Sequence, residues 1–95
     1  MRHLALFRFE PGYFGPEAVK RTEQVFQQLK QELPDDLLGY QIFTHCVERD
    51  TNADICIDIH LKGPESLPVY LPHPIHQALV AEWIPHVVNR ITFDC

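Results

Sequence analysis

Apolar residues and one threonine recur at alternating intervals of three and four between Pro16 and Pro34. The recurring positions are Val19, Thr22, Phe26, Leu29 and Leu33. The residues between them are mostly Lys, Arg, Glu and Gln. This spacing predicts an amphipathic helix with one face toward a core. Pro16 suits the first helical position, and Pro34 ends the helix.

A second pattern, the alternation of apolar and polar residues, is clearest over residues 54–61. Every second residue there is Ile or Leu, and the others are Asp, Cys or His. This period of two predicts a strand with one core face. We expect the other face, which carries Asp58 and His60, to meet solvent or a wet interface.

Three further segments are predicted as strands. Residues 2–9 are rich in Leu and Phe and end before a Pro-Gly turn, residues 38–47 follow the first helix, and residues 90–95 close the chain. The first of these is largely apolar on both faces. That pattern is typical of a strand buried between layers or at a subunit contact.

Prolines and glycine divide the segment that follows the clearest strand. Gly63 and Pro64 stop that strand and open a short helical turn that runs to about Tyr70. Pro74 is placed to start a second helix, and Pro85 is expected to loosen its last turn. The apolar face of this helix comprises His76, Leu79, Val80, Trp83 and Val87.

The predicted order of elements is β-α-β-β-α-β, which is the order of the ferredoxin-like α+β fold. Right-handed crossovers place both helices on one face of a four-stranded antiparallel sheet. The chain has 95 residues, so we expect a single domain over residues 1–95. The other face of the sheet stays uncovered although Leu4 and Leu6 point toward it. We therefore expect a second copy of the chain to cover it in a homodimer.

Charge and composition limit the partners of the chain. The net charge is −5 and the eight Lys and Arg residues are scattered, which argues against a nucleic-acid partner. No apolar stretch approaches the roughly 20 residues of a membrane span, and the apolar run before Arg8 is too short for a signal-peptide core. The three cysteines show no C-x-x-C or metal-ligand spacing. We expect a cytoplasmic protein without a nucleic-acid or membrane partner.

The segment from Tyr70 to His76 carries the candidate chemistry. Tyr70, His73 and His76 follow one another at intervals of three, and two prolines restrict the backbone between them. His76 shares a helix face with apolar residues and so points toward the sheet, where His3 on the first strand can lie opposite. A phenol beside an imidazole in a partly apolar cavity can exchange protons near neutral pH.

Three interpretations of this segment stay open. In the first, His76 bonds to Tyr70 or to a backbone carbonyl and holds the turn together. In the second, Tyr70 and His76 line a pocket in which they orient a small ligand or move a proton. In the third, His73 and His76 bind a metal with His3. Because Pro74 separates the two histidines and no carboxylate is close in sequence, we expect neither a metal nor a cofactor. No nucleophile elbow, phosphate-binding glycine loop or Cys–His catalytic arrangement is present.

Three motifs together resemble the stress-responsive dimeric α/β-barrel (Dabb) family. They are R-H-L-A-L-F-R-F at residues 2–9, Y-L-P-H-P-I-H at residues 70–76 and the terminal Phe93-Asp94. The resemblance implies a ferredoxin-like monomer, a barrel-like homodimer and a cavity between the helices and the sheet. The chain is distantly similar to the olivetolic acid cyclase branch of that family. That similarity implies an acid–base pair at Tyr70 and His76 and a cavity histidine at His3.

Three hypotheses about function follow from these observations. The leading one is a dimer that binds a small, partly apolar ligand at His3, Tyr70, His73 and His76, with no assigned activity. The second is a cofactor-independent enzyme that uses Tyr70 and His76 for proton transfer, such as cyclisation, isomerisation or decarboxylation of a carbonyl compound. The third is a structural, stress-protective dimer. The sequence assigns no role to Arg90.

Overall fold

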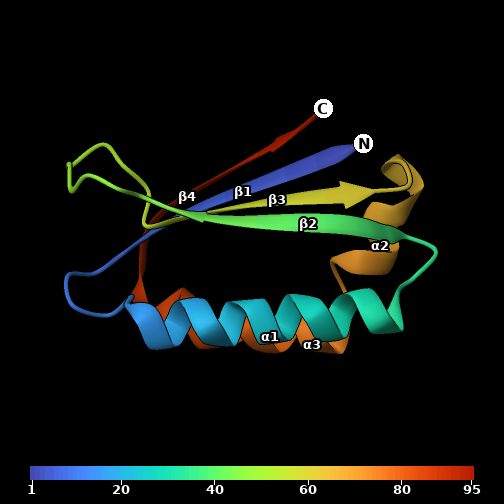
Figure 1. Ribbon diagram of the computed structural model, residues 1–95, viewed down its shortest axis with the longest axis horizontal. Coiled ribbons are helices and arrows are strands. Elements are labelled where there is room, and N and C mark those ends of the chain that lie inside the picture. Colours follow the sequence, from blue (N-terminus) through green and yellow to red (C-terminus); the bar gives the residue numbers. More distant parts are fainter.

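A four-stranded antiparallel sheet and a layer of helices form the computed structural model, which describes residues 1–95 (Figure 1). The strand order is β2-β3-β1-β4. The strands are β1 (Arg2–Phe9), β2 (Leu37–Thr44), β3 (Ile55–Leu61) and β4 (Val87–Asp94). The helices are α1 (Pro16–Glu32), α2 (Leu67–Tyr70) and α3 (Pro74–Trp83), with the 3₁₀ turns η1 (Pro64–Ser66) and η2 (Ile84–His86). Because α1 and α3 cover the same face of the sheet, the predicted ferredoxin-like α+β fold is confirmed.

The helix α1 begins at Pro16 as predicted and packs its apolar face against the sheet. It buries Thr22, Val25, Phe26 and Leu29, and the four apolar residues of β3 that face it are each at most 2% exposed. Fully burying a side chain such as Leu, Ile or Phe contributes roughly 1.5–3 kcal/mol. This contact therefore holds the two layers together. None of the helices is both long and apolar enough to span a membrane.

The strand register decides which residues of the edge strand β4 face the helices. On β1, His3 lies opposite Asp94, Ala5 opposite Thr92 and Phe7 opposite Arg90. Directly paired residues share a face of a sheet. Since Ala5 of β1 also pairs with the buried Ile57 of β3, Arg90, Thr92 and Asp94 all belong to the side that faces the helices.

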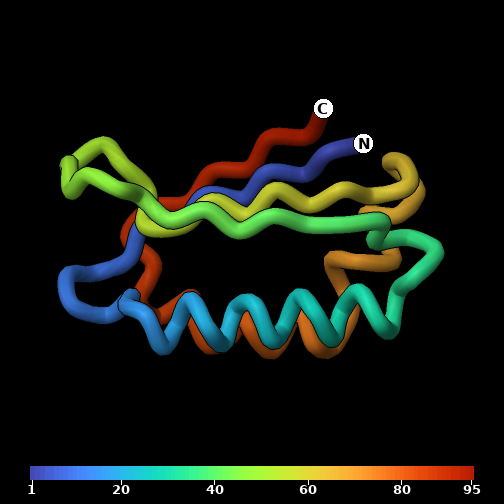
Figure 2. The backbone as a smooth tube through the Cα atoms, in the orientation of Figure 1, coloured from blue at the N-terminus to red at the C-terminus, as the bar shows by residue number.

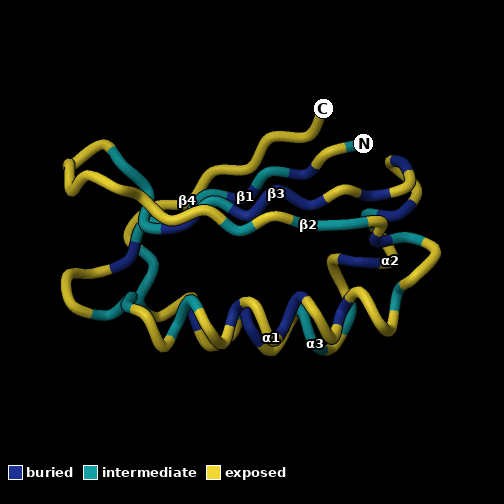
Figure 3. The backbone as a smooth tube through the Cα atoms, in the orientation of Figure 1, coloured by how far each residue is buried: buried dark blue, intermediate teal, exposed yellow.

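The opposite face of the sheet carries an apolar surface that no helix covers. Leu4 pairs with Phe93, and Leu6 pairs with Ile91. Phe93 is 64% exposed and Ile91 is 65% exposed, and Figure 3 shows β4 as exposed along most of its length. Exposed apolar surface of this kind marks an interaction site. We call Leu4, Leu6, Ile91 and Phe93 the open-face surface.

The carboxylate of Asp58 is buried, although the sequence predicts that it meets solvent or a wet interface. Asp58 is only 3% exposed because Arg2 on β1 lies over it. The Nε atom of Arg2 donates to Oδ1 of Asp58 at 3.2 Å, and a second nitrogen donates to Oδ2. These hydrogen bonds lower the pKa of Asp58. Alternation shows which face a residue occupies but not whether a long neighbouring side chain covers it. His60 is exposed as predicted.

The strand β2 ends at Thr44, whereas the sequence predicts an end at Val47. The side chain of Arg8 donates to the carbonyl oxygens of Arg49 at 2.9 Å and Asn52 at 2.6 Å. The side-chain amide of Asn52 donates to the carbonyl oxygen of Val47 at 2.9 Å. Carbonyl groups beyond Thr44 are thus bound by side chains, and the ladder stops.

The strand β4 begins at Val87, whereas the sequence predicts a start at Arg90 and places Val87 on the second helix. Pro85 has no backbone N–H to continue the helix, so α3 ends at Trp83 and η2 leads directly into the strand. Val87 pairs with Phe9 of β1. At the other end of this strand, the pairing of β1 with β4 brings the two chain ends side by side (Figure 2), where Arg2 and Cys95 exchange backbone hydrogen bonds at 2.7 and 2.9 Å.

Candidate functional site

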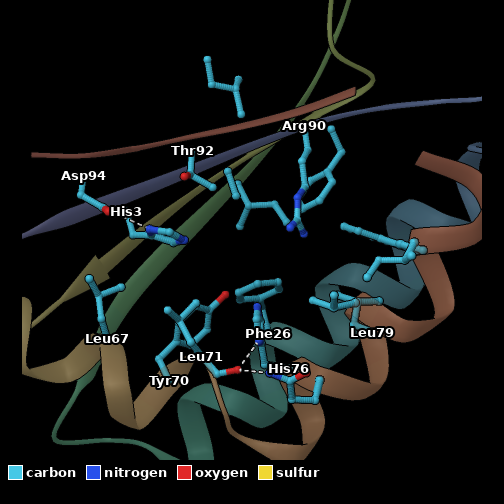
Figure 4. Close-up of a pocket in the computed structure, with 18 residues that line it drawn as sticks. His3, Phe26, Leu67, Tyr70, Leu71, His76, Leu79, Arg90, Thr92 and Asp94 are labelled. Carbon is cyan, nitrogen blue, oxygen red and sulfur yellow. Dashed lines mark hydrogen bonds and ion pairs between the residues drawn. The ribbon is translucent and has the colours of Figure 1, made fainter. Parts of the chain in front are cut away.

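A cavity of about 500 Å³ lies between the sheet and the helices (Figure 4). Its floor comes from β1, β4 and Ile57 of β3, and its walls come from α2, α3 and the Phe26 side chain of α1. Most lining residues are apolar. Pockets that bind small molecules are typically about 300–1,000 Å³ and are lined by apolar side chains with a few polar groups. The cavity therefore has the size and character of a small-molecule site.

The cavity opens between the edge strand β4 and the helix α3. Its lining residues Ala5, Phe26 and Tyr70 are buried, whereas Arg90 of β4 and Gln77 of α3 are exposed. The buried residues thus form the closed end, and the exposed ones form the mouth.

Tyr70 ends the short helix α2 and lies at the closed end of the cavity. Its ring contacts the rings of His3, Phe26 and His76, with centroids 6.0, 6.4 and 4.6 Å away. The hydroxyl makes no hydrogen bond within the chain and points into the cavity (Figure 4). Burial raises the pKa of Tyr70, so the phenol stays protonated at neutral pH. It can donate a hydrogen bond to a bound molecule.

His76 lies in the first turn of α3 and lines the cavity beside Tyr70. Its Nδ1 atom is 2.8 Å from the carbonyl oxygen of Leu71. A carbonyl can only accept, so Nδ1 carries the proton and Nε2 of the neutral ring has a free lone pair. Burial is the main cause that lowers the pKa of His76, and the neighbouring His3 and His73 lower it further. His76 is therefore a neutral base at physiological pH.

His3 projects from β1 at the closed end of the cavity and is 6% exposed. Its Nδ1 atom pairs with the carboxylate of Asp94, which lies opposite on β4. A carboxylate on one ring nitrogen fixes the orientation of the imidazole and leaves the other nitrogen available. Asp94 is not among the site residues that the sequence predicts. Alternation along β4 could have placed it beside His3, but only once the strand pairing was known.

His73 does not line the cavity, although it lies near enough to His76 to lower its pKa. Its Nδ1 atom accepts a hydrogen bond from the backbone N–H of Ile75 at 3.1 Å. Its Nε2 atom is 3.5 Å from a carboxylate oxygen of Glu32 at the end of α1. His73 thus caps the N-terminus of α3 and joins it to α1.

The side chains that converge closely enough for a metal ion lie elsewhere in the molecule. They are His45, Glu48 and Asp54, whose ligand atoms all lie within 4.8 Å of one another on the β2–β3 connection. His45 and Glu48 are exposed, and Nε2 of His45 is 2.9 Å from Glu48. Their proximity is accounted for by this ion pair. The histidines at α3 form no such group.

Solved structures with this fold place the chain in a known class. It is 26% identical to a dimeric ferredoxin-like protein of unknown function from Thermobifida fusca, with 97% of this chain and 85% of the other covered and a TM-score of 0.76. A hydroxynitrile lyase from Passiflora edulis is 10% identical over 97% and 87% of the two chains, with a TM-score of 0.74. A Dabb family protein from Mesorhizobium loti is 15% identical over 99% and 92%, with a TM-score of 0.66. The fold is that of the Dabb-like, ferredoxin-like proteins, as the motifs predict.

Sequence comparison identifies a narrower family within this class. The sequence matches no protein-family model. It is 31% identical over 84 residues to the uncharacterized protein SCO4036 of Streptomyces coelicolor, covering 87% of this chain and 86% of that protein. The chain therefore belongs to the family of this Streptomyces protein, within the Dabb-like, ferredoxin-like class.

Proposed function

We propose that the protein is a homodimer that binds a small, partly apolar molecule in the cavity between helices and sheet. Tyr70 donates a hydrogen bond to a carbonyl or hydroxyl oxygen of that molecule. The observation that carries this proposal is the Tyr70 hydroxyl, which belongs to a residue only 2% exposed and lacks a partner within the chain. No fully buried side-chain oxygen or nitrogen of the chain lacks a hydrogen-bond partner, so the unpaired Tyr70 hydroxyl is accessible from the cavity. A bound oxygen atom would supply the missing partner.

A purely structural role accounts for only part of this arrangement. His73 caps α3, and the bond from His76 to the Leu71 carbonyl steadies the turn before that helix. The Tyr70 hydroxyl does not take part in either contact. In a stress-protective dimer without a ligand, the third hypothesis, that hydroxyl would bind only water. A role under stress stays part of the proposal through the resemblance to the Dabb family alone, and a cytoplasmic location stays an expectation from the sequence.

Proton transfer is a second candidate, favoured by the protonation states of two neighbouring side chains. Nε2 of His76 can take a proton from a carbon next to a carbonyl group, and the electron pair of that C–H bond then moves onto the carbonyl oxygen. Tyr70 would stabilise the resulting enolate oxygen by a hydrogen bond, and protonated His76 would return the proton to the product. A hydroxynitrile lyase shares the fold, which supports lyase-type chemistry in this class of protein.

The homodimer is supported by the open-face surface and by the relatives. Ile91 and Phe93 expose about two-thirds of their surface on a face that no helix covers. The Thermobifida fusca protein of the same fold is dimeric. A second sheet packed against this face would remove apolar surface from water, and each Å² removed would stabilise the dimer by about 25 cal/mol.

Fluorescence of Trp83 can test ligand binding, because this residue is the single tryptophan and lines the cavity. Neutral ketones such as acetophenone and 2-heptanone serve as ligands in titrations of wild type, Tyr70→Phe and the control Tyr40→Phe. We expect saturable quenching that is weakened by Tyr70→Phe and unchanged by Tyr40→Phe. Quenching that is unsaturable, or equal in all three proteins, would contradict the proposed site. Native mass spectrometry of freshly purified protein would show a retained ligand and the dimer together.

A further inference from the structure

Arg90 is the single Lys or Arg side chain among the residues that line the cavity. It extends from β4 toward the helices and into the cavity (Figure 4). No carboxylate lies within 4.0 Å of its guanidinium, and it makes no hydrogen bond within the chain. The cavity mouth thus carries a positive charge without a partner.

Other arginines of the chain that reach a neighbouring element are paired. The pairs are Arg2 with Asp58, Arg8 with Glu48 and Arg21 with Glu82. Arg90 instead has apolar neighbours, because it pairs across the sheet with Phe7 and lines the cavity with Trp83 and Ile84. A guanidinium tolerates such surroundings because it is weakly hydrated and stacks on aromatic rings.

The one carboxylate that lines the cavity does not neutralise this charge. Asp94 lies on the same strand and the same face, but its carboxylate pairs with Nδ1 of His3. The guanidinium nitrogens of Arg90 lie more than 4.0 Å, the limit for an ion pair, from the carboxylate oxygens of Asp94. The fork of the Arg90 guanidinium therefore stays free, and its geometry matches a carboxylate that accepts two parallel hydrogen bonds.

We infer that the ligand of the cavity is a small organic acid, whose carboxylate lies against Arg90 at the mouth. Its apolar alkyl or aryl part fills the cavity, and an oxygen at its far end reaches the Tyr70 hydroxyl. This inference rests on the proposed function, because it needs the cavity to be the binding site. It narrows the ligands from partly apolar molecules in general to carboxylates.

Pairs of an acid and its neutral amide separate charge recognition from shape. 5-Oxohexanoate with 5-oxohexanamide, and 4-acetylbenzoate with 4-acetylbenzamide, each have a carbonyl oxygen at the far end and differ little in size, but carry or lack the negative charge. A charge-assisted hydrogen bond contributes roughly 1.5–3 kcal/mol. In titrations followed by Trp83 fluorescence at low salt, we expect each acid to bind the wild type at least about tenfold more tightly than its amide.

Variants then show whether Arg90 causes the preference for the acid over its amide. Arg90→Gln should remove the preference for the acid, and Arg90→Lys should keep part of it, since the charge remains but the fork is lost. Arg49→Gln is the matched control, because it removes the same charge from the exposed β2–β3 connection. It should leave the preference intact. Circular dichroism and light scattering check that each variant keeps its fold and assembly.

Each outcome decides a different point. Equal binding of acid and amide to the wild type would overturn the inference about Arg90 while leaving the proposed cavity site in place. A preference that survives in Arg90→Gln would also overturn it, and a change of that variant to a monomer would assign Arg90 to the dimer instead. If neither acids nor amides bind, the proposed function itself fails.

Discussion

The imidazole of His76 lies against the ring of Tyr70, with centroids 4.6 Å apart and ring planes inclined by 49°. No hydrogen bond joins the two side chains, because Nδ1 of His76 donates to Leu71 and the Tyr70 hydroxyl points into the cavity. A donor and a base are thus adjacent but both free for a third molecule. This arrangement supports the proposed ligand site.

The first prediction concerns the Tyr70 hydroxyl. Tyr70→Phe keeps the buried ring, and no group of the chain loses a partner, so the free energy of unfolding should change by less than about 0.5 kcal/mol. Affinity for a carbonyl ligand should fall by roughly 0.5–1.5 kcal/mol, the net contribution of one hydrogen bond. Urea unfolding and fluorescence titration measure the two quantities. A large loss of stability with unchanged affinity would assign the hydroxyl to the fold.

The second prediction uses the depressed pKa of His76. Burial makes the neutral ring more favourable in the folded state than in the unfolded state, whose pKa is near 6.5. Below that pH the unfolded chain gains a proton that the folded chain resists, so the contribution of His76 to stability is fully present above pH 6.5 and declines as the pH falls toward the folded pKa.

His76→Asn tests this dependence, because its side-chain amide can still donate to the Leu71 carbonyl. The difference in free energy of unfolding between wild type and variant should be constant above about pH 7.5. Below pH 6.5, the wild type should lose stability relative to the variant. The other histidines are the same in both proteins, and among them only His3 and His73 affect the pKa of His76. A difference that does not change from pH 5 to 8 would contradict a depressed pKa.

The third prediction separates His73 from the cavity. Because its Nδ1 atom caps α3 through the N–H of Ile75, His73→Ala should lower the free energy of unfolding by about 1 kcal/mol. His73→Asn, which restores a capping oxygen, should recover most of that loss. Ligand affinity should stay within about twofold of wild type in both variants, because His73 does not line the cavity. Weaker binding by His73→Ala at unchanged stability would return His73 to the ligand site.

The fourth prediction concerns assembly. Phe93→Asp places a charge in the open-face surface, where burial of an unpaired carboxylate is costly. By light scattering at micromolar concentration, we expect a dimer for the wild type and a monomer for this variant. Val47→Asp changes another exposed apolar residue on the β2–β3 connection and should leave the dimer intact. A dimeric Phe93→Asp protein would place the subunit contact elsewhere.

The periodicity of the sequence was sufficient to predict the layers of this fold. The helix at Pro16, the alternating strand β3 and the helix at Pro74 all follow from local spacing and proline positions, which the structure keeps. Strand ends were less predictable. They depend on Arg8 binding carbonyl groups of the β2–β3 connection and on Pro85 ending α3 early, and both effects involve contacts that spacing does not encode.

The candidate site was predictable only where it is local in sequence. Tyr70 and His76 lie in one short segment, and helix geometry was enough to aim His76 at the sheet. His73 occurs in the same motif, yet its backbone conformation turns the side chain to the start of α3. Asp94 and Arg90 join the cavity through pairing of β4 with β1. That pairing brings together opposite ends of the chain, so no local pattern reveals it.

The last prediction concerns the buried carboxylate on the open face. Arg2 bonds to Asp58 and so lowers the pKa of Asp58 in the folded protein below its ordinary value of 3.8. The ionised form is then favoured by folding, and the stability contributed by the pair is fully present above about pH 4 and lost as the pH falls through the folded pKa.

Asp58→Asn removes the charge but keeps the shape of the side chain. Its melting temperature should be a few degrees below wild type at pH 7, and this gap should narrow as the pH falls below about 4. Thermal unfolding from pH 2.5 to 7 measures this, with Asp50→Asn on the exposed β2–β3 connection as the control. A gap that stays constant over the whole range would mean that Asp58 stabilises the sheet by shape and not by its charge.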